Sequence, residues 1–465
     1  MAKYIFIQQK VSLQTNTFGL FSATEGPERI PIFYYLKGKN HMSILSYVAI
    51  AVIIVTVWAL AKRYETRLVL FAAGFFLCVL AMNPMEALNS FAKSMTKGGL
   101  IMAICSSMGF AYVATMCKAD RSLVHYLASP IKGLGIFLIP VCTAVTFVLN
   151  IAIPSAAGCS AAVGATLIPV MLRAGIKPAA AAAAVFGGTM GSLLSPGSAH
   201  NPFISNMAKM DMMDFIAYHS TYSIIIGVIS AVGLLVVCFL LGDHKGDTNA
   251  QAQVEAKNDG FKANPILAVL TVLPIIILVT GNVWIPAIKM GVAQAMVLGA
   301  IVLLLASWLI NRTNPQEFSK NFFSGMGKAY GDVMGIIIAA GVFAAGLKAA
   351  GLIDAFIALL KTSNDIARWG GSLGPWFMAI ISGSGDAATF AFNEAVTPHA
   401  KEFGMEIHSL GALAYLSGAI GRTMSPIAGG MIVVCGIAMA NPIEVAKRTA
   451  IPMTVAVFLL AFVMV

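Results

Sequence analysis

Charge is scarce in this chain of 465 residues: 11% of the residues are Asp, Glu, Lys or Arg, whereas 58% are hydrophobic. A water-soluble domain needs more polar side chains than this to cover its surface, so the composition excludes an ordinary soluble protein. Apolar runs of about 20 residues recur along almost the whole chain, as helices that cross a bilayer require. The sequence therefore predicts an all-α integral membrane protein with about 11–12 transmembrane helices.

Several motifs of enzymes and pumps are also missing. The chain has no HExxH motif and no Ser/His/Asp pattern, which disfavours a membrane-embedded enzyme. It has no GxxxxGK[ST] loop, so a single-chain ATP-driven pump is excluded. The seven cysteines are scattered singly through apolar runs without a CxxC pair. They are predicted to be small buried fillers, and no disulfide framework, metal site or cofactor is expected.

The net charge of +10 comes from basic residues in short loops between the apolar runs. This distribution is the positive-inside pattern of membrane proteins, and it gives no reason to expect nucleic-acid binding. The basic loops at 62–67 and 118–132 are predicted to lie inside, which places the N-terminus outside.

Composition divides the chain into four segments. Residues 1–41 are mixed polar and aromatic, and they are interpreted as a poorly structured preface with Met42 as an alternative natural start. A polar linker at 242–262 separates residues 42–241 from residues 263–465. These two long segments are predicted to be transmembrane repeats.

Short motifs in the two halves match at a nearly constant offset. "GGTMGSLLSP" (187–196) aligns with "SGAIGRTMSP" (417–426) at an offset of 230, and Ser155 aligns with Ser382 at 227. Repeats in a membrane protein are typical of secondary transporters, and such repeats are often inverted. Inverted repeats need an odd number of crossings in each half, whereas the apolar runs give about six. Either one segment in each half does not cross, or the repeats are parallel.

Polar islands predict a re-entrant hairpin and a broken helix in each half. They lie at 154–162 and 195–202 in the first half and at 382–394 and 421–426 in the second. Gly and Pro interrupt helices there, and the freed backbone groups are tolerated at membrane depth only inside protein or beside a watery cavity. Paired breaks of this kind point to a transporter's central site. The run at 179–188 is interpreted as a packing face instead.

The breaks predict a binding site for a small carboxylate. Helix N-termini and hydroxyls attract anions, and Arg422, inside an apolar span, can hold a carboxylate with two hydrogen bonds. The alternative for Arg422 is a structural salt bridge with Asp386 or Glu394. The predicted substrate-binding residues are Ser155, Gly158, Ser195, Gly197, Ser198, Asn201, Ser382, Gly383, Ser384, Gly385, Thr389, Arg422, Thr423 and Ser425.

Asp386, Glu394 and His200 are the candidates for carrying a coupling ion, H⁺ or Na⁺. A buried carboxylate can carry a proton or ligate sodium beside backbone carbonyls. Alternatively, Glu394 lies in a wet vestibule and His200 is a satisfied loop residue. The two acids also favour a second function, a cation/proton antiporter on a related scaffold, which Arg422 and the hydroxyl-rich breaks disfavour.

Four stretches resemble the anaerobic C4-dicarboxylate transporters of the DcuC type. They are "GVFAAGLKAAGLIDAF" (341–356), "SGSGDAATFAF" from Ser382, "GRTMSPIAGGMIVVCGIAMANPIEVAKRTAIP" (421–452) and "GATLIPVMLRAGIKPAAAAA" in the first half. The resemblance runs from about residue 45 to the C-terminus. By position, the resemblance implies that the site includes Ser382, Gly383, Ser384, Gly385, Gly421, Arg422, Ser425 and Pro426.

The resemblance implies a multi-pass protein of the bacterial inner membrane, in an ion-transporter superfamily with inverted repeats and re-entrant hairpins. Its substrates would be succinate, fumarate, malate or aspartate, moved by cation-coupled symport, antiport or exchange. Analogy with the wider group adds the expectation of a homodimer. Two departures bear on the substrate: "SPGSAHNP" differs from the family pattern, and Asp386 stands where Asn commonly follows the SGSG. An acid there calls for a proton, a bound cation or a substrate that bears an amine.

Overall fold

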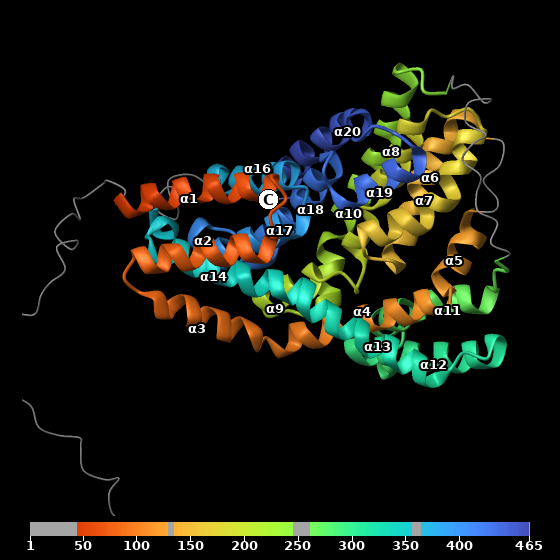
Figure 1. Cartoon of the computed structure of the whole chain (residues 1–465), viewed down its shortest axis with the longest axis horizontal. Helices are drawn as coiled ribbons and strands as arrows, with labels where there is room; N and C mark the ends of the chain where they lie inside the picture. The colour runs from red at the N-terminus through yellow and green to blue at the C-terminus, as the bar shows by residue number, and fades with distance from the viewer. Residues whose placement is uncertain (1–43, 129–133, 245–260, 356–363, 465) are drawn as a thin grey trace, which may run out of the picture. The chain divides into compact units, whose positions relative to one another are not determined.

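The computed structural model describes residues 44–128, 134–244, 261–355 and 364–464, which form helices joined by short turns, with no strand among them (Figure 1). The predicted preface at 1–41 and most of the linker at 242–262 lie outside these ranges. Within them, nine helical segments are long and apolar enough to cross a membrane, and three shorter apolar segments accompany them. The prediction of an all-α membrane protein is confirmed.

The helices of the first half include one that the sequence pattern missed. They are α1 (Ile44–Ala61), α2 (Thr66–Leu80), α3 (Pro84–Met95), α4 (Gly98–Met116), α5 (Ala119–Ala128), α6 (Leu138–Ala152), α7 (Ala156–Arg173), α8 (Pro178–Gly188), the short 3₁₀ helix η3 (Gly191–Leu194), α9 (His200–Ala208) and α10 (Met212–Leu240). Only a polar island was predicted where α7 begins, yet α7 is apolar and long enough to count among the candidate spans.

The second half contributes the remaining described helices. Its described helices are α11 (Pro265–Val283), α12 (Val292–Asn311), α13 (Pro315–Ala329), α14 (Gly335–Ala349), α16 (Asn364–Ser382), α17 (Gly385–Ala395), α18 (Ile407–Met424), α19 (Gly429–Ala438) and α20 (Pro442–Val463). Proline begins α8, α11, α13 and α20, because the first helical position has no hydrogen-bonded amide proton to lose.

Helix ends recur at equivalent positions in the two halves. Lys209 ends α9 and Met439 ends α19, each with a left-handed backbone at φ 56° and 53°. The next helix begins two residues later with a side-chain cap, from Asp211 in the first half and from Asn441 in the second. Both pairs stand 230 residues apart, the offset of the shared motifs. The duplication itself stays a prediction from the sequence.

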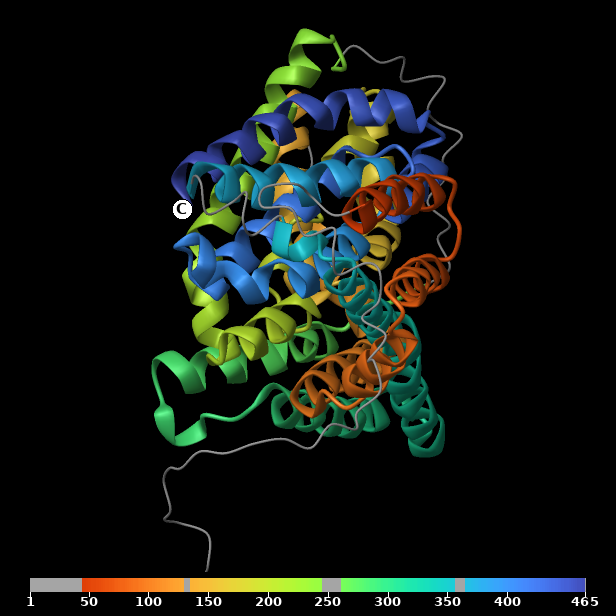
Figure 2. The same cartoon turned by 90° about the vertical axis from the view of Figure 1, so that its left-hand side faces the viewer.

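Segments from the two halves pack against one another. A π-helical turn at Tyr330–Met334 joins α13 to α14, and this long helix contacts α4 through α13 and both α2 and α3 through α14. Both views show it, in teal, running beside the orange α3–α4 segments (Figure 1, Figure 2). Elsewhere α19 packs on α7 and α8, and α9 packs on α17 and α18. The helices beside the polar islands of the first half (α7, α8 and α9) therefore contact those beside the polar islands of the second half (α17, α18 and α19).

Within each half, a glycine allows a very close approach of two helical segments. A Cβ atom on Gly191 would lie 1.8 Å from the carbonyl oxygen of Phe147, and one on Gly421 would lie 2.1 Å from that of Trp376. Backbone atoms cannot move away unless a whole helix shifts, so only glycine fits. These contacts hold each broken helix against the hairpin helix of its own half.

We expect Gly421→Ala to lower the free energy of unfolding by about 1–3 kcal/mol, because the added methyl group overpacks a backbone contact. Gly191→Ala should behave alike. The midpoint of thermal unfolding in detergent measures the effect. Gly436→Ala is the matched control, since nothing lies within 4 Å of a Cβ there. Equal midpoints for Gly421→Ala and Gly436→Ala would contradict this account of the packing.

Candidate functional site

A serine caps the helix that leaves each hairpin tip. The hydroxyl of Ser155 accepts a hydrogen bond from a backbone N–H at the start of α7 (3.2 Å), and that of Ser384 does the same for α17 (3.1 Å). By this shared role Ser155 corresponds to Ser384, whereas the sequence motifs match Ser155 with Ser382. Ser382 instead donates to the carbonyl oxygen of Met378 at the end of α16 (2.7 Å).

Ser195 and Ser425 shape the two helix breaks. Their backbones have nearly the same conformation, φ −80° and ψ 127° against φ −79° and ψ 122°. Each hydroxyl accepts a hydrogen bond from the amide two residues on, that of Gly197 or Ile427. The Ser425 hydroxyl also donates to the carbonyl oxygen of Ile380 (2.7 Å). These hydroxyls hold the breaks in shape, and that of Ser425 both donates and accepts there.

The first turns of α7, α17 and α19 converge. A Cβ atom added to Gly430 in α19 would lie 3.3 Å from the carbonyl oxygen of Ala156 in α7. A Cβ atom added to Gly383, just before α17, would lie 3.0 Å from the carbonyl oxygen of Ile427, just before α19. Gly385, the first residue of α17, faces the Cβ atom of Arg422. Helix N-termini carry partial positive charge and free N–H groups, so the cluster suits an anion.

The guanidinium of Arg422 lies beside this cluster. Its Nη2 atom donates to the backbone oxygen and the hydroxyl of Thr189, at 3.0 and 3.3 Å, and the group lies 5.6 Å from the centre of the Phe186 ring. Among the described residues, its only other hydrogen bond is a long one from Nη2 to Thr423. Nε and Nη1 therefore donate no hydrogen bond within the described residues.

No carboxylate within the described ranges lies at ion-pairing distance from Arg422. Asp386 pairs with His200, and Glu394 pairs with Lys97. The structure therefore lacks the structural salt bridge that was the alternative for Arg422. An unpaired arginine is expensive at membrane depth and is a functional candidate for that reason.

His200 and Asp386 join the two halves at this point. His200 Nε2 lies 2.9 Å from Asp386 Oδ1, and the imidazole is stacked between the rings of Phe390 (4.1 Å) and Tyr415 (4.5 Å). The Asp386 side chain is 66% exposed, whereas that of His200 is only 6% exposed. The carboxylate therefore faces accessible space with the imidazole behind it. His200 is the buried first residue of α9, so its alternative interpretation as a loop residue is wrong.

Three further predicted residues hold the fold together. Asn201 donates to the carbonyl oxygens of Leu193 and Ser195, which closes the first break. The Ser198 hydroxyl lies 2.7 Å from that of Tyr415, and the Thr423 hydroxyl donates to the backbone one turn earlier. Thr389 differs, because its buried hydroxyl has no hydrogen-bond partner among the described residues.

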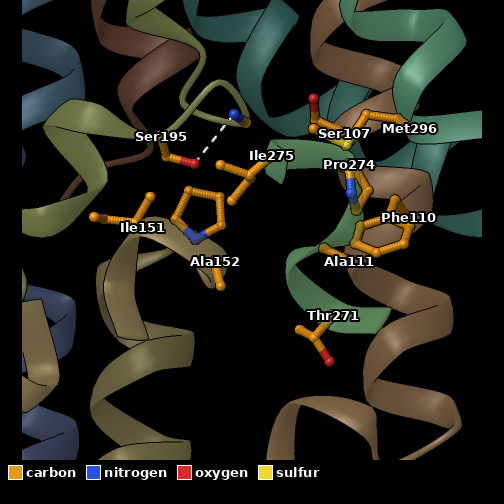
Figure 3. A pocket seen from close by; sticks show the side chains of 12 residues that line it. Ser107, Phe110, Ala111, Ile151, Ala152, Ser195, Thr271, Pro274, Ile275 and Met296 are labelled. Carbon is orange, nitrogen blue, oxygen red and sulfur yellow. Dashed lines mark hydrogen bonds between the residues drawn. The ribbon is translucent and has the colours of Figure 1, made fainter. Parts of the chain in front are cut away.

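The first break leaves little free space of its own. A gap of about 20 Å³ lies between the Ser195–Gly197 turn, the end of α6, α4 and α11 (Figure 3). Its lining includes the apolar side chains of Ile151, Phe110 and Pro274. A water molecule needs about 10–15 Å³ measured in this way, so the gap holds about one water and no carboxylate substrate.

Comparison with known proteins agrees with the architecture. The family described as "DcuC: C4-dicarboxylate anaerobic carrier" matches residues 40–465. The chain belongs to the DcuC family. An uncharacterized transporter of Haemophilus influenzae is 44% identical to it over 283 residues, which cover 58% of this chain and 100% of that protein. The anaerobic C4-dicarboxylate transporter DcuC of Escherichia coli K12 is 26% identical over 439 residues, covering 88% of this chain and 93% of that protein.

A solved structure of Neisseria gonorrhoeae MtrF, described as one of a class of antimetabolite efflux pumps, matches with a TM-score of 0.59. The match covers 91% of this chain and 96% of MtrF at 12% sequence identity, so it shows the fold alone. Family membership makes the chain a transporter and not an enzyme. With its apolar helices and bacterial relatives, it is a multi-pass protein of the bacterial inner membrane.

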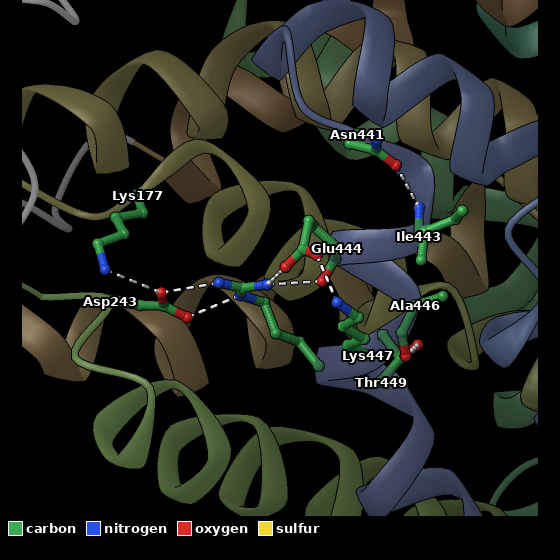
Figure 4. Close-up of polar contacts among 9 residues, drawn as sticks. Lys177, Asp243, Asn441, Ile443, Glu444, Ala446, Lys447 and Thr449 are labelled. Atoms are coloured by element: carbon green, nitrogen blue, oxygen red, sulfur yellow. Dashed lines mark hydrogen bonds and ion pairs between the residues drawn. The ribbon is translucent and has the colours of Figure 1, made fainter.

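Sequence patterns missed a buried ion pair in this DcuC-family transporter. Arg448 on α20 donates from Nε and Nη2 to the two carboxylate oxygens of Asp243, at 2.7 and 2.9 Å. Lys177 Nζ lies 3.7 Å from the same carboxylate, whose exposed fraction is 0% (Figure 4). The only signal was an arginine about two turns into an apolar helix, and its partner stands 205 residues earlier. The pair ties the end of α10 to α20.

Proposed function

We propose that this DcuC-family protein carries four-carbon dicarboxylates such as succinate, fumarate, malate or aspartate through a central site at Arg422. The observation that carries the proposal is Arg422 itself, a cation without a carboxylate partner in the described ranges, beside three converging helix N-termini. One substrate carboxylate binds the free edge of the guanidinium, and the other binds the free N–H groups at a helix start. The name of the Escherichia coli relative supports the same substrate class.

Coupling to a proton is the second part of this proposal. Asp386 and His200 form a hydrogen-bonded pair at the edge of accessible space, and such a pair can take up and release a proton. A proton on the pair offsets the negative charge that Asp386 would otherwise present to an anionic substrate. Glu394 is the weaker candidate, because it is paired with Lys97 at the far end of α17.

We expect Asp386→Asn to transport succinate without the normal response to a pH gradient, because an amide cannot take up the coupled proton. Initial uptake rates in proteoliposomes, with and without an imposed gradient, measure this. Asp354→Asn is the control, since that exposed residue lies outside the central site. If uptake by Asp386→Asn rises with the pH gradient as steeply as wild-type uptake does, another residue carries the coupled proton.

Alternating access would follow from two inverted repeats. If α6–α7 and α16–α17 are re-entrant hairpins that turn back within the membrane, each half keeps five crossings, an odd number. In the first half these are α1, α2, the α3–α4 pair, the broken α8–α9 helix and α10. The miscount of six would then come from counting one arm of each hairpin as a span. A homodimer stays a prediction by analogy.

Transport in liposomes tests the proposed function. Purified protein is reconstituted and supplied with labelled succinate, fumarate or aspartate under proton and sodium gradients. We expect uptake or exchange of at least one of the three. If none moves while protons or sodium ions do, the chain is a cation antiporter and the dicarboxylate proposal is wrong.

A further inference from the structure

A second hollow lies at the opposite ends of α9 and α17 from the central site. Its volume is about 660 Å³, and its lining comes from α3, the start of α4, α9, α14, the last turn of α17 and the 3₁₀ helix η6 (Thr397–Phe403). Ile353, after α14, and His399, in η6, are also part of the lining. Small-molecule sites typically measure about 300–1,000 Å³, so this cavity is large enough for an organic ligand. We call it the lysine cavity.

The lysine cavity carries an excess of positive charge. Lys93, Lys97 and Lys348 line it, and the one carboxylate in its lining is that of Glu394. Glu394 forms an ion pair with Lys97. Lys93 and Lys348 have no carboxylate within ion-pairing distance among the described residues, and both are exposed. Two unneutralised ammonium groups in the cavity lining, from α3 and α14, attract small anions and raise their local concentration.

A chain of direct contacts joins the lysine cavity to the central site. The Lys97 ammonium lies 5.4 Å from the centre of the Phe203 ring. Phe203 packs edge-on against Phe390 at 5.0 Å, and Phe390 stacks on His200 at 4.1 Å. The same two helices thus carry both sites, with His200 and Asp386 at their first turns and the cavity lining further along.

We propose that the lysine cavity is a second anion-binding site, which holds a dicarboxylate outside the central site. Lys93 and Lys348 bind its carboxylates. Glu394 neutralises Lys97 through their ion pair, which keeps the affinity for the anion low enough for release. The identity of the anion rests on the proposed function. The existence of an anion site does not, because it follows from the cavity and its charges.

Thiol labelling tests the proposal in the full-length chain. The seven native cysteines are buried, so Ser90→Cys introduces an accessible thiol into the cavity lining and leaves every lysine in place. An anionic methanethiosulfonate should modify this thiol about tenfold faster than a cationic one, because the cavity concentrates anions. Asn83→Cys, an exposed position outside the lining, is the control and should show no such preference. Lys93→Gln together with Lys348→Gln should abolish the preference.

Protection by ligand separates this proposal from the central site. Succinate should slow the modification of Ser90→Cys, and it should still do so when Arg422→Gln has removed the central binding site. Protection without any succinate transport by the wild-type protein would refute the proposed function and leave the anion site standing. Equal rates for the two reagents at position 90, or no protection by succinate, would overturn the second site.

Discussion

Arg422→Gln is expected to reduce succinate uptake about 30-fold or more, because removing one partner of a desolvated charge pair costs about 2–5 kcal/mol and each 1.4 kcal/mol is tenfold. Arg422→Lys should fall between this variant and the wild type. It keeps the charge, but an ammonium cannot present the two parallel N–H groups of a guanidinium edge. Initial uptake rates in proteoliposomes at equal protein content measure both variants.

Two controls separate binding from folding in this experiment. Arg422 also donates to the backbone oxygen of Thr189, so the midpoint of thermal unfolding must be compared for each variant. Arg173→Gln removes an exposed arginine from the end of α7, and it should leave uptake unchanged. Wild-type uptake by Arg422→Gln would remove the guanidinium from the substrate site.

Asp243→Ala is expected to destabilise the protein by about 3–5 kcal/mol, because it removes the buried carboxylate that pairs with Arg448 and leaves only the longer contact to the exposed Glu444, at 3.4 Å. The exposed fraction of Arg448 is only 7%, so water cannot easily replace the lost carboxylate. The expected result is a much lower midpoint of thermal unfolding in detergent, with less protein recovered as a single species. Figure 4 shows the polar contacts of Asp243 that the substitution removes.

Removing both charges provides the test of this explanation. Asp243→Leu combined with Arg448→Met deletes the pair together, and apolar replacements of buried pairs are often neutral. The double variant should therefore be more stable than Asp243→Ala. Glu444→Gln changes an exposed carboxylate beside the same arginine and should have little effect. A double variant as unstable as the single one would show that the site needs the ions for another reason.

The sequence predicted those features that neighbouring residues determine. Membrane helices follow from apolar runs, and the breaks at Ser195-Pro196 and Ser425-Pro426 follow from residues that cannot continue a helix. The cluster around Ser384 and Arg422 was also predicted, since the matched polar islands marked both elements. Local chemistry is enough for such predictions.

The partners of these residues depend on helix packing, which local patterns do not report. His200 meets Asp386 from 186 positions away, and Arg448 meets Asp243 from 205. Hydroxyls such as that of Ser425 looked free in the sequence but bind backbone carbonyls in the fold. The lysine cavity was missed for the same reason: its cations come from separate segments and look like ordinary loop charges.

A structure determined with succinate bound tests the central claim most directly. We predict ligand density with one carboxylate on the Nε–Nη1 edge of Arg422 and the other at the first turn of α7, α17 or α19. Density confined to the lysine cavity or elsewhere, with the Arg422 edge still unoccupied at saturating succinate, would contradict a central site built on this arginine.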